Sequence, residues 1–373
     1  MKLSFLFFLI PFLALIVGVS FAGFKAASFS GVITTPHARQ IVGWIFVLMP
    51  IVLLLTMAIG SFINSSINTF FYIITVTWLP ILIYLFMATV LLTIINLLAT
   101  SFGHPFTMTP LAIISIVIAA GATAFGIINA TMPRVVTYEI DAPALSAAWS
   151  GKNIVLVSDT HLGVVRSAHF MEKVVKKINE QKPDLVLIAG DLIDGPIFNY
   201  AKGLAPLAGI QSTFGTVYTP GNHEGYNREP EKFYPAVRPL VTTLVDEVTT
   251  INGTTILGLD YRQESKDATS KRLVAAGFNA ADPTIAILHD PTNSPALLDA
   301  GVSLIVSGHT HCGQFFPLTI LVKSIYKEFT YGVTVRDNSV GTKSVAITTC
   351  GVGTAMSPLR LGTNPEVVVL RIK

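Results

Sequence analysis

No aspartate, glutamate, lysine or arginine occurs in the 94 residues between Arg39 and Arg134. A charged side chain at the centre of a membrane-spanning helix costs at least about 2.5–3.5 kcal/mol. Buried core helices of a soluble domain rarely follow one another without a charged face. So long an uncharged stretch therefore predicts lipid as the solvent for this part of the chain.

Four stretches are long enough to cross a bilayer, which takes about 20 apolar residues. They are residues 3–24, 41–62, 70–98 and 110–130. The first has a longer apolar run than a cleaved signal sequence, so we expect an uncleaved anchor. None of the four contains an acidic, basic or histidine side chain of the kind that lines transport pathways. We therefore expect a membrane domain, residues 1–133, with about four transmembrane helices that act as an anchor or as a wall for a lipid-like substrate.

Charge is concentrated in the rest of the chain, where residues 134–373 contain 44 of the 47 acidic and basic side chains. Short β-rich runs alternate there with polar helical segments, which predicts an α/β layered domain. The net charge of +3 includes no basic run or patch, which excludes a nucleic-acid binder. Two cysteines are too few for a disulfide framework or a thiolate zinc site.

Potential metal ligands follow five of the expected strands, which are residues 153–158, 184–189, 216–219, 284–288 and 304–307. Ligand sites in open α/β sheets lie at the carboxyl ends of strands, so we expect these side chains to meet at one sheet edge. Carboxylates and imidazoles buried together are unfavourable without a cation. The pattern therefore predicts a metal site among the Asp, Asn and His side chains that follow these strands.

These motifs resemble those of the calcineurin-like metallophosphoesterase superfamily: D-x-H at 159–161, G-D-x-x-D at 190–194, G-N-H-E at 221–224, a lone His289, and G-H-x-H at 308–311. The resemblance extends over residues 134–373 and implies a four-layer α/β/β/α sandwich. The GHTHCGQ segment at 308–314 and the tail Gly351–Val367 resemble the final motif and closing strand of a membrane-associated branch, which includes the transmembrane protein with metallophosphoesterase domain.

The resemblance implies two divalent metal ions that share Asp191. One ion would also take Asp159, His161 and His311, and the other would take Asn222, His289 and His309. Mixed nitrogen and oxygen ligands without thiolate suit manganese, iron, zinc or nickel. We favour manganese, with iron, zinc or nickel as alternatives.

The resemblance also assigns roles around the ions. His223 would protonate the leaving oxygen or stabilise charge on the phosphoryl group, and Asp194 would orient it, unless Asp194 only caps a turn. We expect Glu224 to have a structural role in its loop. Arg360 is a candidate for contact with a substrate phosphate, although an arginine near the end of a strand is more often a solvated surface group.

Together these inferences predict a membrane-anchored dimetal phosphohydrolase that cleaves a phosphodiester or pyrophosphate bond by attack of metal-activated hydroxide. Its substrate would be lipid- or nucleotide-linked. The alternatives are a phosphomonoesterase and a non-catalytic metal-binding membrane module. The oligomeric state stays open.

The cellular location is expected to be the cell membrane, with a multi-pass topology. Basic residues are equal in number on the two sides of the predicted spans, so the side of the catalytic domain stays unresolved. Cys312 and Cys350 either form a disulfide, which requires an oxidising compartment, or remain two buried thiols. This gives only a slight preference for an extracytoplasmic domain.

Overall fold

The computed structural model describes residues 17, 18, 21, 24, 35–60, 66–194, 199–226, 229–262, 264–337, 341 and 343–373. The chain divides into two units, Met1–Ile127 and Ile128–Lys373, and each is described by itself. The expected span at 3–24 lies almost entirely outside the described residues.

The N-terminal unit contains three described helices that are long and apolar enough to cross a membrane. They lie at the expected stretches 41–62, 70–98 and 110–130, with shifted ends. Phe46 and Trp78 pack edge to face, with ring centroids 5.4 Å apart. Because most other apolar side chains of these helices are exposed, the unit is suited to lipid and the chain is membrane-associated. The helices are α2 (Pro36–Gly60), α3 (Ser66–Ser101) and α4 (Met108–Asn129).

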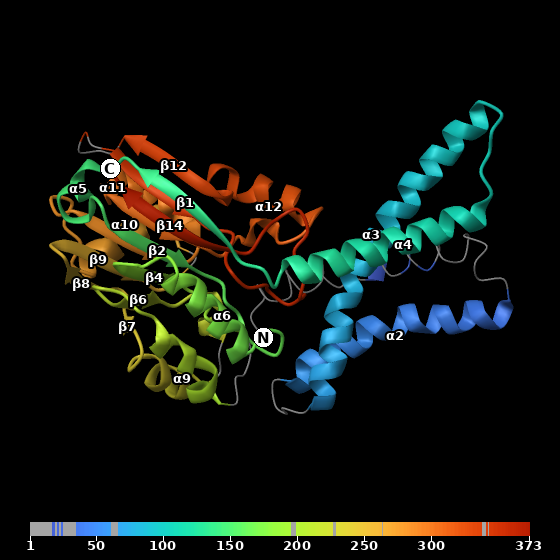
Figure 1. Cartoon of the computed structure of the whole chain (residues 1–373), viewed down its shortest axis with the longest axis horizontal. Coiled ribbons are helices and arrows are strands. Elements are labelled where there is room, and N and C mark those ends of the chain that lie inside the picture. The colour runs from blue at the N-terminus through green and yellow to red at the C-terminus, as the bar shows by residue number, and fades with distance from the viewer. Residues whose placement is uncertain are drawn as a thin grey trace. The chain divides into compact units, whose positions relative to one another are not determined.

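The C-terminal unit contains two six-stranded sheets (Figure 1). The first has the order β1 (Arg134–Ile140), β14 (Glu366–Ile372), β2 (Asn153–Val157), β4 (Leu185–Ala189), β6 (Thr216–Thr219) and β7 (Thr242–Thr243). The second has the order β12 (Gly332–Asp337), β13 (Lys343–Thr348), β11 (Leu304–Ser307), β10 (Thr284–Leu288), β9 (Thr254–Leu259) and β8 (Glu247–Ile251). A short pair consists of β3 (Leu162–Gly163) and β5 (Ile193–Asp194).

Helices cover the outer faces of the two sheets. The α-helices are α5 (Pro143–Trp149), α6 (Ala168–Asn179), α7 (Tyr200–Leu204), α8 (Asn222–Tyr226), α9 (Pro230–Val237), α10 (Lys266–Ala275), α11 (Ser294–Ala300) and α12 (Leu318–Tyr326). The short 3₁₀ turns are η1 (Ala205–Gly209), η2 (Pro291–Asn293), η3 (His311–Gly313) and η4 (Lys327–Thr330).

Successive side chains of a strand point to opposite faces of its sheet, and this alternation produces the layers. In β2, Val155 and Val157 pack with α6 and α9, whereas Ile154 and Leu156 pack against the second sheet. On the far side, Leu257 of β9 joins a core with residues of α10 and α11. The expected four-layer α/β/β/α sandwich is therefore confirmed.

The strand order places several carboxyl ends together. Strands β2, β4 and β6 are parallel neighbours in the first sheet, and β9, β10 and β11 are parallel neighbours in the second. The expectation of one sheet edge needs correction, because the edges of two facing sheets contribute. The expectation of a closing strand over Gly351–Val367 also needs correction. The strand begins only at Glu366, and residues 351–365 form a loop with an isolated bridge at Leu361.

Candidate metal centre

Every expected metal ligand lies at the carboxyl end of a strand. The loop after β2 carries Asp159 and His161, and the loop after β4 carries Asp191. Asn222 begins α8 directly after β6. The second sheet contributes His289 after β10, and His309 and His311 after β11.

The first group consists of Asp159, His161 and His311, whose potential ligand atoms point toward one another. The Nε2 atoms of His161 and His311 lie 3.0 Å apart. His311 Nε2 lies 3.2 Å from Asp159 Oδ1. All three side chains are at least nine-tenths buried.

The second group consists of Asp191, Asn222, His289 and His309. His289 Nε2 lies 3.1 Å from Asp191 Oδ2, 3.1 Å from Asn222 Oδ1 and 3.2 Å from His309 Nδ1. The other ring nitrogen of His289, Nδ1, lies 2.7 Å from the carbonyl oxygen of Ala189, which leaves Nε2 directed into the group.

One oxygen belongs to both groups. Asp191 Oδ2 lies 3.1 Å from His289 Nε2 and 3.6 Å from His161 Nε2. The other oxygen, Oδ1, accepts the backbone N–H of His223 at 2.9 Å. The carboxylate thus lies between two histidine-rich groups, in the position expected of a bridging ligand.

The electrostatics of the two groups favour an added positive charge. Burial lowers the pKa of His161 to about 4, so its ring is neutral and keeps a free lone pair. Burial also works against a charged His289, yet the Asp191 carboxylate raises the pKa of His289 to about 10. The charged His289 in turn holds the pKa of Asp191 well below its usual range, although burial opposes this. A divalent cation would take the place of the His289 proton, and the carboxylates and imidazoles would then form a donor set suited to that cation.

A further pair of side chains, His223 and Asp194, lies beside these two groups and is less buried. His223 Nδ1 lies 3.0 Å from Asp194 Oδ1, and both side chains are 23% exposed. Burial lowers the pKa of His223, but the hydrogen bond to Asp194 and the negative charges of Asp191 and Asp194 together raise that pKa to about 9. His223 therefore carries a proton that it can donate at neutral pH. The expected pairing of these two residues is present.

The ligand loops adopt left-handed backbone conformations. Asp159, His161, Asp191, His309 and His311 have φ between 47° and 69°, a region that few residues other than glycine adopt. Such strain persists only where the surroundings determine the conformation, and it clusters at functional sites.

Gly308 shows how tightly the loops approach. A Cβ atom at this position would overlap Ser158 Oγ and Asp159 Oδ2. Only glycine lets the β11 loop, from the second sheet, lie against the β2 loop, from the first.

Glu224 ties two of the ligand loops together. Its buried carboxylate accepts the backbone N–H groups of Asp191, Leu192 and Ile193 at 3.0, 2.7 and 3.1 Å. It also accepts the N–H of Gly221 at 2.7 Å. The expected structural role is thus supported, because one side chain holds the β4 loop against the β6 loop.

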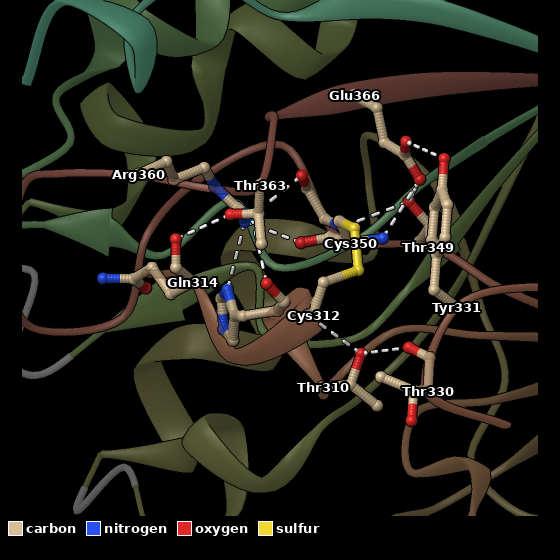
Figure 2. Close-up of a disulfide and its surroundings, with 12 residues drawn as sticks. Thr310, Cys312, Gln314, Thr330, Tyr331, Thr349, Cys350, Arg360, Thr363 and Glu366 are labelled. Atoms are coloured by element: carbon tan, nitrogen blue, oxygen red, sulfur yellow. Dashed lines mark hydrogen bonds between the residues drawn. A yellow bond between two sulfur atoms is a disulfide. The ribbon is translucent and has the colours of Figure 1, made fainter. Parts of the chain in front are cut away.

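The guanidinium of Arg360 lies close to Cys350 and Thr363 (Figure 2). It is 0% exposed. It donates to the carbonyl oxygens of Gly353, His311 and Cys350 at 2.9, 3.2 and 2.6 Å. Both earlier expectations need correction: a fully buried guanidinium with these partners contacts no substrate phosphate and is not a solvated surface group. Arg360 instead holds the β11 loop against the β13 loop.

The same two loops are linked covalently. Cys312 and Cys350 form a disulfide with a Cα–Cα distance of 5.0 Å (Figure 2). Cys312 directly follows His311, and Cys350 directly precedes Gly351, which packs against Asp159. Of the two alternatives left open by the sequence, the structure contains the disulfide.

Sequence reasoning gave no role to three side chains beside His309. Asp290 Oδ2 lies 3.7 Å from His309 Nε2. The rings of Tyr261 and Tyr326 lie 5.9 and 6.0 Å from the His309 ring. The carboxylate next to His289 was a usable signal, whereas single tyrosines at variable spacing were not.

Residues 152–313 match the family model of the calcineurin-like phosphoesterases. The chain is 31% identical over 233 residues to an uncharacterized metallophosphoesterase of Helicobacter pylori strain J99, covering 59% of each chain. It is 27% identical over 280 residues to the transmembrane protein with metallophosphoesterase domain of Danio rerio, covering 70% of this chain and 62% of that protein.

The protein of the same name from Bos taurus is 30% identical over 267 residues, covering 66% of this chain and 58% of the bovine protein. This chain therefore spans about 58–62% of the length of these three relatives. The family match covers most of the ligand loops described above. The C-terminal unit of this chain is a calcineurin-like phosphoesterase domain.

Proposed function

We propose that the chain is a membrane-anchored dimetal phosphohydrolase that cleaves a phosphodiester or pyrophosphate bond. The observation that carries this proposal is the position of Asp191 Oδ2, 3.1 Å from His289 Nε2 and 3.6 Å from His161 Nε2. One metal ion would be held by Asp159, His161, Asp191 and His311, and the other by Asp191, Asn222, His289 and His309.

The residues present fit a pair of divalent ions. Four histidine nitrogens, two carboxylates and one amide oxygen surround the two positions, and thiolates are absent among these seven. The raised pKa of His289 indicates that the carboxylates draw positive charge into the site. This donor set suits manganese, which we favour, as well as iron, zinc or nickel.

When bound, the two ions would supply positive charge to a phosphate oxygen and lower the pKa of a water molecule. The chain itself supplies the proton for the departing oxygen. We assign this donation to His223, because its ring is partly exposed and its Nδ1 donates to Asp194, which leaves the proton on Nε2 for the departing oxygen. Asp194 acts as a positioning residue, since it orients the ring and raises its pKa.

The membrane context suggests the substrate class. We propose a membrane domain at residues 1–133 with several transmembrane passes, a metallophosphoesterase domain at 134–373, and a lipid- or nucleotide-linked phosphate as substrate. The Cys312–Cys350 disulfide supports an extracytoplasmic position of the catalytic domain, because such bonds persist in oxidising compartments.

The test is hydrolysis by the full chain purified in detergent, after its metal content has been measured. Bis-p-nitrophenyl phosphate and p-nitrophenyl phosphate would be compared with added manganese. We expect preference for the diester, and a strong preference for the monoester would identify a phosphomonoesterase instead. Bound metal without hydrolysis of either compound, or of nucleotide-conjugate and phospholipid panels, would indicate a non-catalytic metal-binding module.

A further inference from the structure

Helix α12 presents an apolar face that the described part of the C-terminal unit does not cover. Ile320, Leu321 and Ile325 are 61%, 55% and 60% exposed, and no residue of the helix is buried. Helical spacing places these three side chains on one side of the helix. Clustered apolar exposure of this kind marks an interaction surface, unlike single exposed apolar residues.

The start of α12 lies beside the segment through which the chain enters this unit. Asn129, the last residue of apolar helix α4, donates from its side-chain amide to the carbonyl oxygens of Arg360 and Thr363 at 3.1 and 2.9 Å. In the same loop, the carbonyl oxygen of Leu361 accepts the N–H of Phe316 at 2.8 Å. Phe316 is 39% exposed and lies two residues before α12. A row of hydrogen bonds thus connects the end of a membrane-type helix to the segment from which α12 begins.

The other end of α12 reaches the candidate metal centre. Tyr326 is its last residue, and the Tyr326 ring centroid lies 6.0 Å from that of His309. A helix of 9 residues is about 13 Å long. The apolar face of α12 therefore lies between two features: the segment linked to the end of α4, and the second ligand group, which contains His309.

Basic side chains accompany the apolar face. Lys323 lies within α12 and Lys327 directly follows it, and both are exposed. An apolar face bordered by lysines is typical of helices that lie in the membrane interface, where the face is buried about 5–10 Å into the headgroup region. The lysines suit the anionic headgroups of such a surface.

We propose that α12 is an interfacial membrane helix and that Ile320, Leu321 and Ile325 insert into the lipid headgroup region. The occupant of this face is lipid rather than a second copy of the chain, because the segment before α12 is linked through the 360–363 loop to Asn129 at the end of α4, and because lysines border the face. Lipid contact goes beyond the proposed function. Its consequence for the substrate rests on that function: the centre would open at the bilayer surface and accept a phosphate carried by a lipid.

The test measures lipid contact directly in the full chain. The protein is reconstituted in nanodiscs of phosphatidylcholine and phosphatidylglycerol, with and without bromine atoms on the acyl chains. Leu321→Cys and Ile325→Cys are each labelled with bimane under conditions that keep the native disulfide intact. Val274→Cys on α10 is the matched control, because Val274 is an apolar side chain with 72% exposure on another helix.

We expect brominated lipid to quench bimane at positions 321 and 325 and to leave the label at position 274 unchanged. Equal fluorescence with and without bromine at both α12 positions would overturn the proposal. A blue-shifted label that bromine does not quench would also overturn it, since protein would then cover the face.

If either cysteine variant fails to fold, Ser324→Cys on the same face provides the same test with the same two outcomes. The readout involves no hydrolysis. An inactive protein with quenched labels would therefore contradict the proposed function alone. An active protein with unquenched labels would contradict only the proposal that α12 lies in the membrane interface.

Discussion

Single carboxylates determine what this site can do. Asp191 offers one oxygen to both ligand groups, and its other oxygen accepts the N–H of His223. Asp194 contacts the proposed proton donor instead, with His223 Nδ1 3.0 Å away. Two aspartates three positions apart in the chain therefore have different roles because they face different partners.

Replacing Asp191 with asparagine removes the negative charge shared by the two proposed ions. We expect Asp191→Asn to lose detectable turnover and to bind less metal at both positions, as measured by hydrolysis of bis-p-nitrophenyl phosphate and by metal analysis. Asp267→Asn, an exposed change on α10, is the control and should leave turnover and metal content unchanged.

His223→Ala should instead keep both ions while turnover falls by about 10²–10⁴. Loss of metal in that variant would contradict the division between ligand and acid.

Asp194→Asn should move the high-pH limb of the rate profile. Asp194 and Asp191 together raise the pKa of His223 to about 9 against the effect of burial, and the proton donor is active only below that pKa. Without the carboxylate the pKa falls, so activity should be lost at a lower pH than in the unmodified protein. The measurement is kcat as a function of pH with saturating metal. An unchanged limb would mean that another group donates the proton.

At the scale of elements, side chains and one disulfide hold loops from different strands in place. Glu224 joins the loops after β4 and β6 through four backbone N–H groups. Arg360 and the disulfide join the loops after β11 and β13. The left-handed backbone at five proposed ligands requires such support.

Glu224→Gln should weaken both stability and metal binding. The glutamine amide would place an NH₂ group among four N–H donors, leaving buried donors without an acceptor. We expect a loss of about 1–3 kcal/mol in the free energy of unfolding. Metal affinity should fall by about 10–100-fold, as for other residues that support ligands. Denaturant titration would measure the free energy of unfolding, and metal titration would measure the affinity. Glu231→Gln, at an exposed position, is the control. A variant as stable as the parent would exclude the loop-holding role.

Removing the disulfide should destabilise the domain. Cys312 and Cys350 are 38 positions apart, so the bond restricts a long loop in the unfolded chain. For Cys312→Ser combined with Cys350→Ser we expect a loss of about 2–4 kcal/mol. Denaturant unfolding of the two proteins gives the difference. Alkylation of the native protein without reduction, followed by mass spectrometry, should modify neither cysteine, and two modified thiols would contradict the bond.

At the scale of the whole molecule, one chain contains an apolar helical unit and an α/β domain with a candidate metal centre. The charged residues lie almost entirely in the second unit, so the two units require different solvents. Within the second unit, the ligand loops come from both sheets. Any ions bound between them would therefore link the two halves of the sandwich.

Metal removal should accordingly lower the stability of the catalytic domain. Ions that bind only the folded state stabilise it by about 2.7 kcal/mol when their concentration is 100 times the dissociation constant. We expect a chelator to lower the unfolding temperature and added manganese to restore it. Thermal unfolding monitored by tyrosine and tryptophan fluorescence measures the change, and an unfolding temperature that ignores both additions would argue against bound ions.

The sequence alone determined features that depend on local patterns. Strands such as Thr216–Thr219 and Thr284–Leu288 match the structure residue for residue, because short β-rich runs next to Gly or Pro mark strands. The lack of charge between Arg39 and Arg134 similarly predicts apolar helices. The aspartates, asparagine and histidines after the strands predicted a metal site, the family resemblance nominated seven of them as ligands, and the structure brings these seven together.

Only the tertiary structure decided which distant residues meet. It places ligands on two facing sheets, buries Arg360 beneath His311, pairs the two cysteines, and leaves one face of α12 exposed. These outcomes depend on contacts between segments far apart in the chain, where a local pattern carries no information about partners. Arginine is the clearest case: its type predicts a surface group, but a ring of backbone carbonyl oxygens makes burial favourable here.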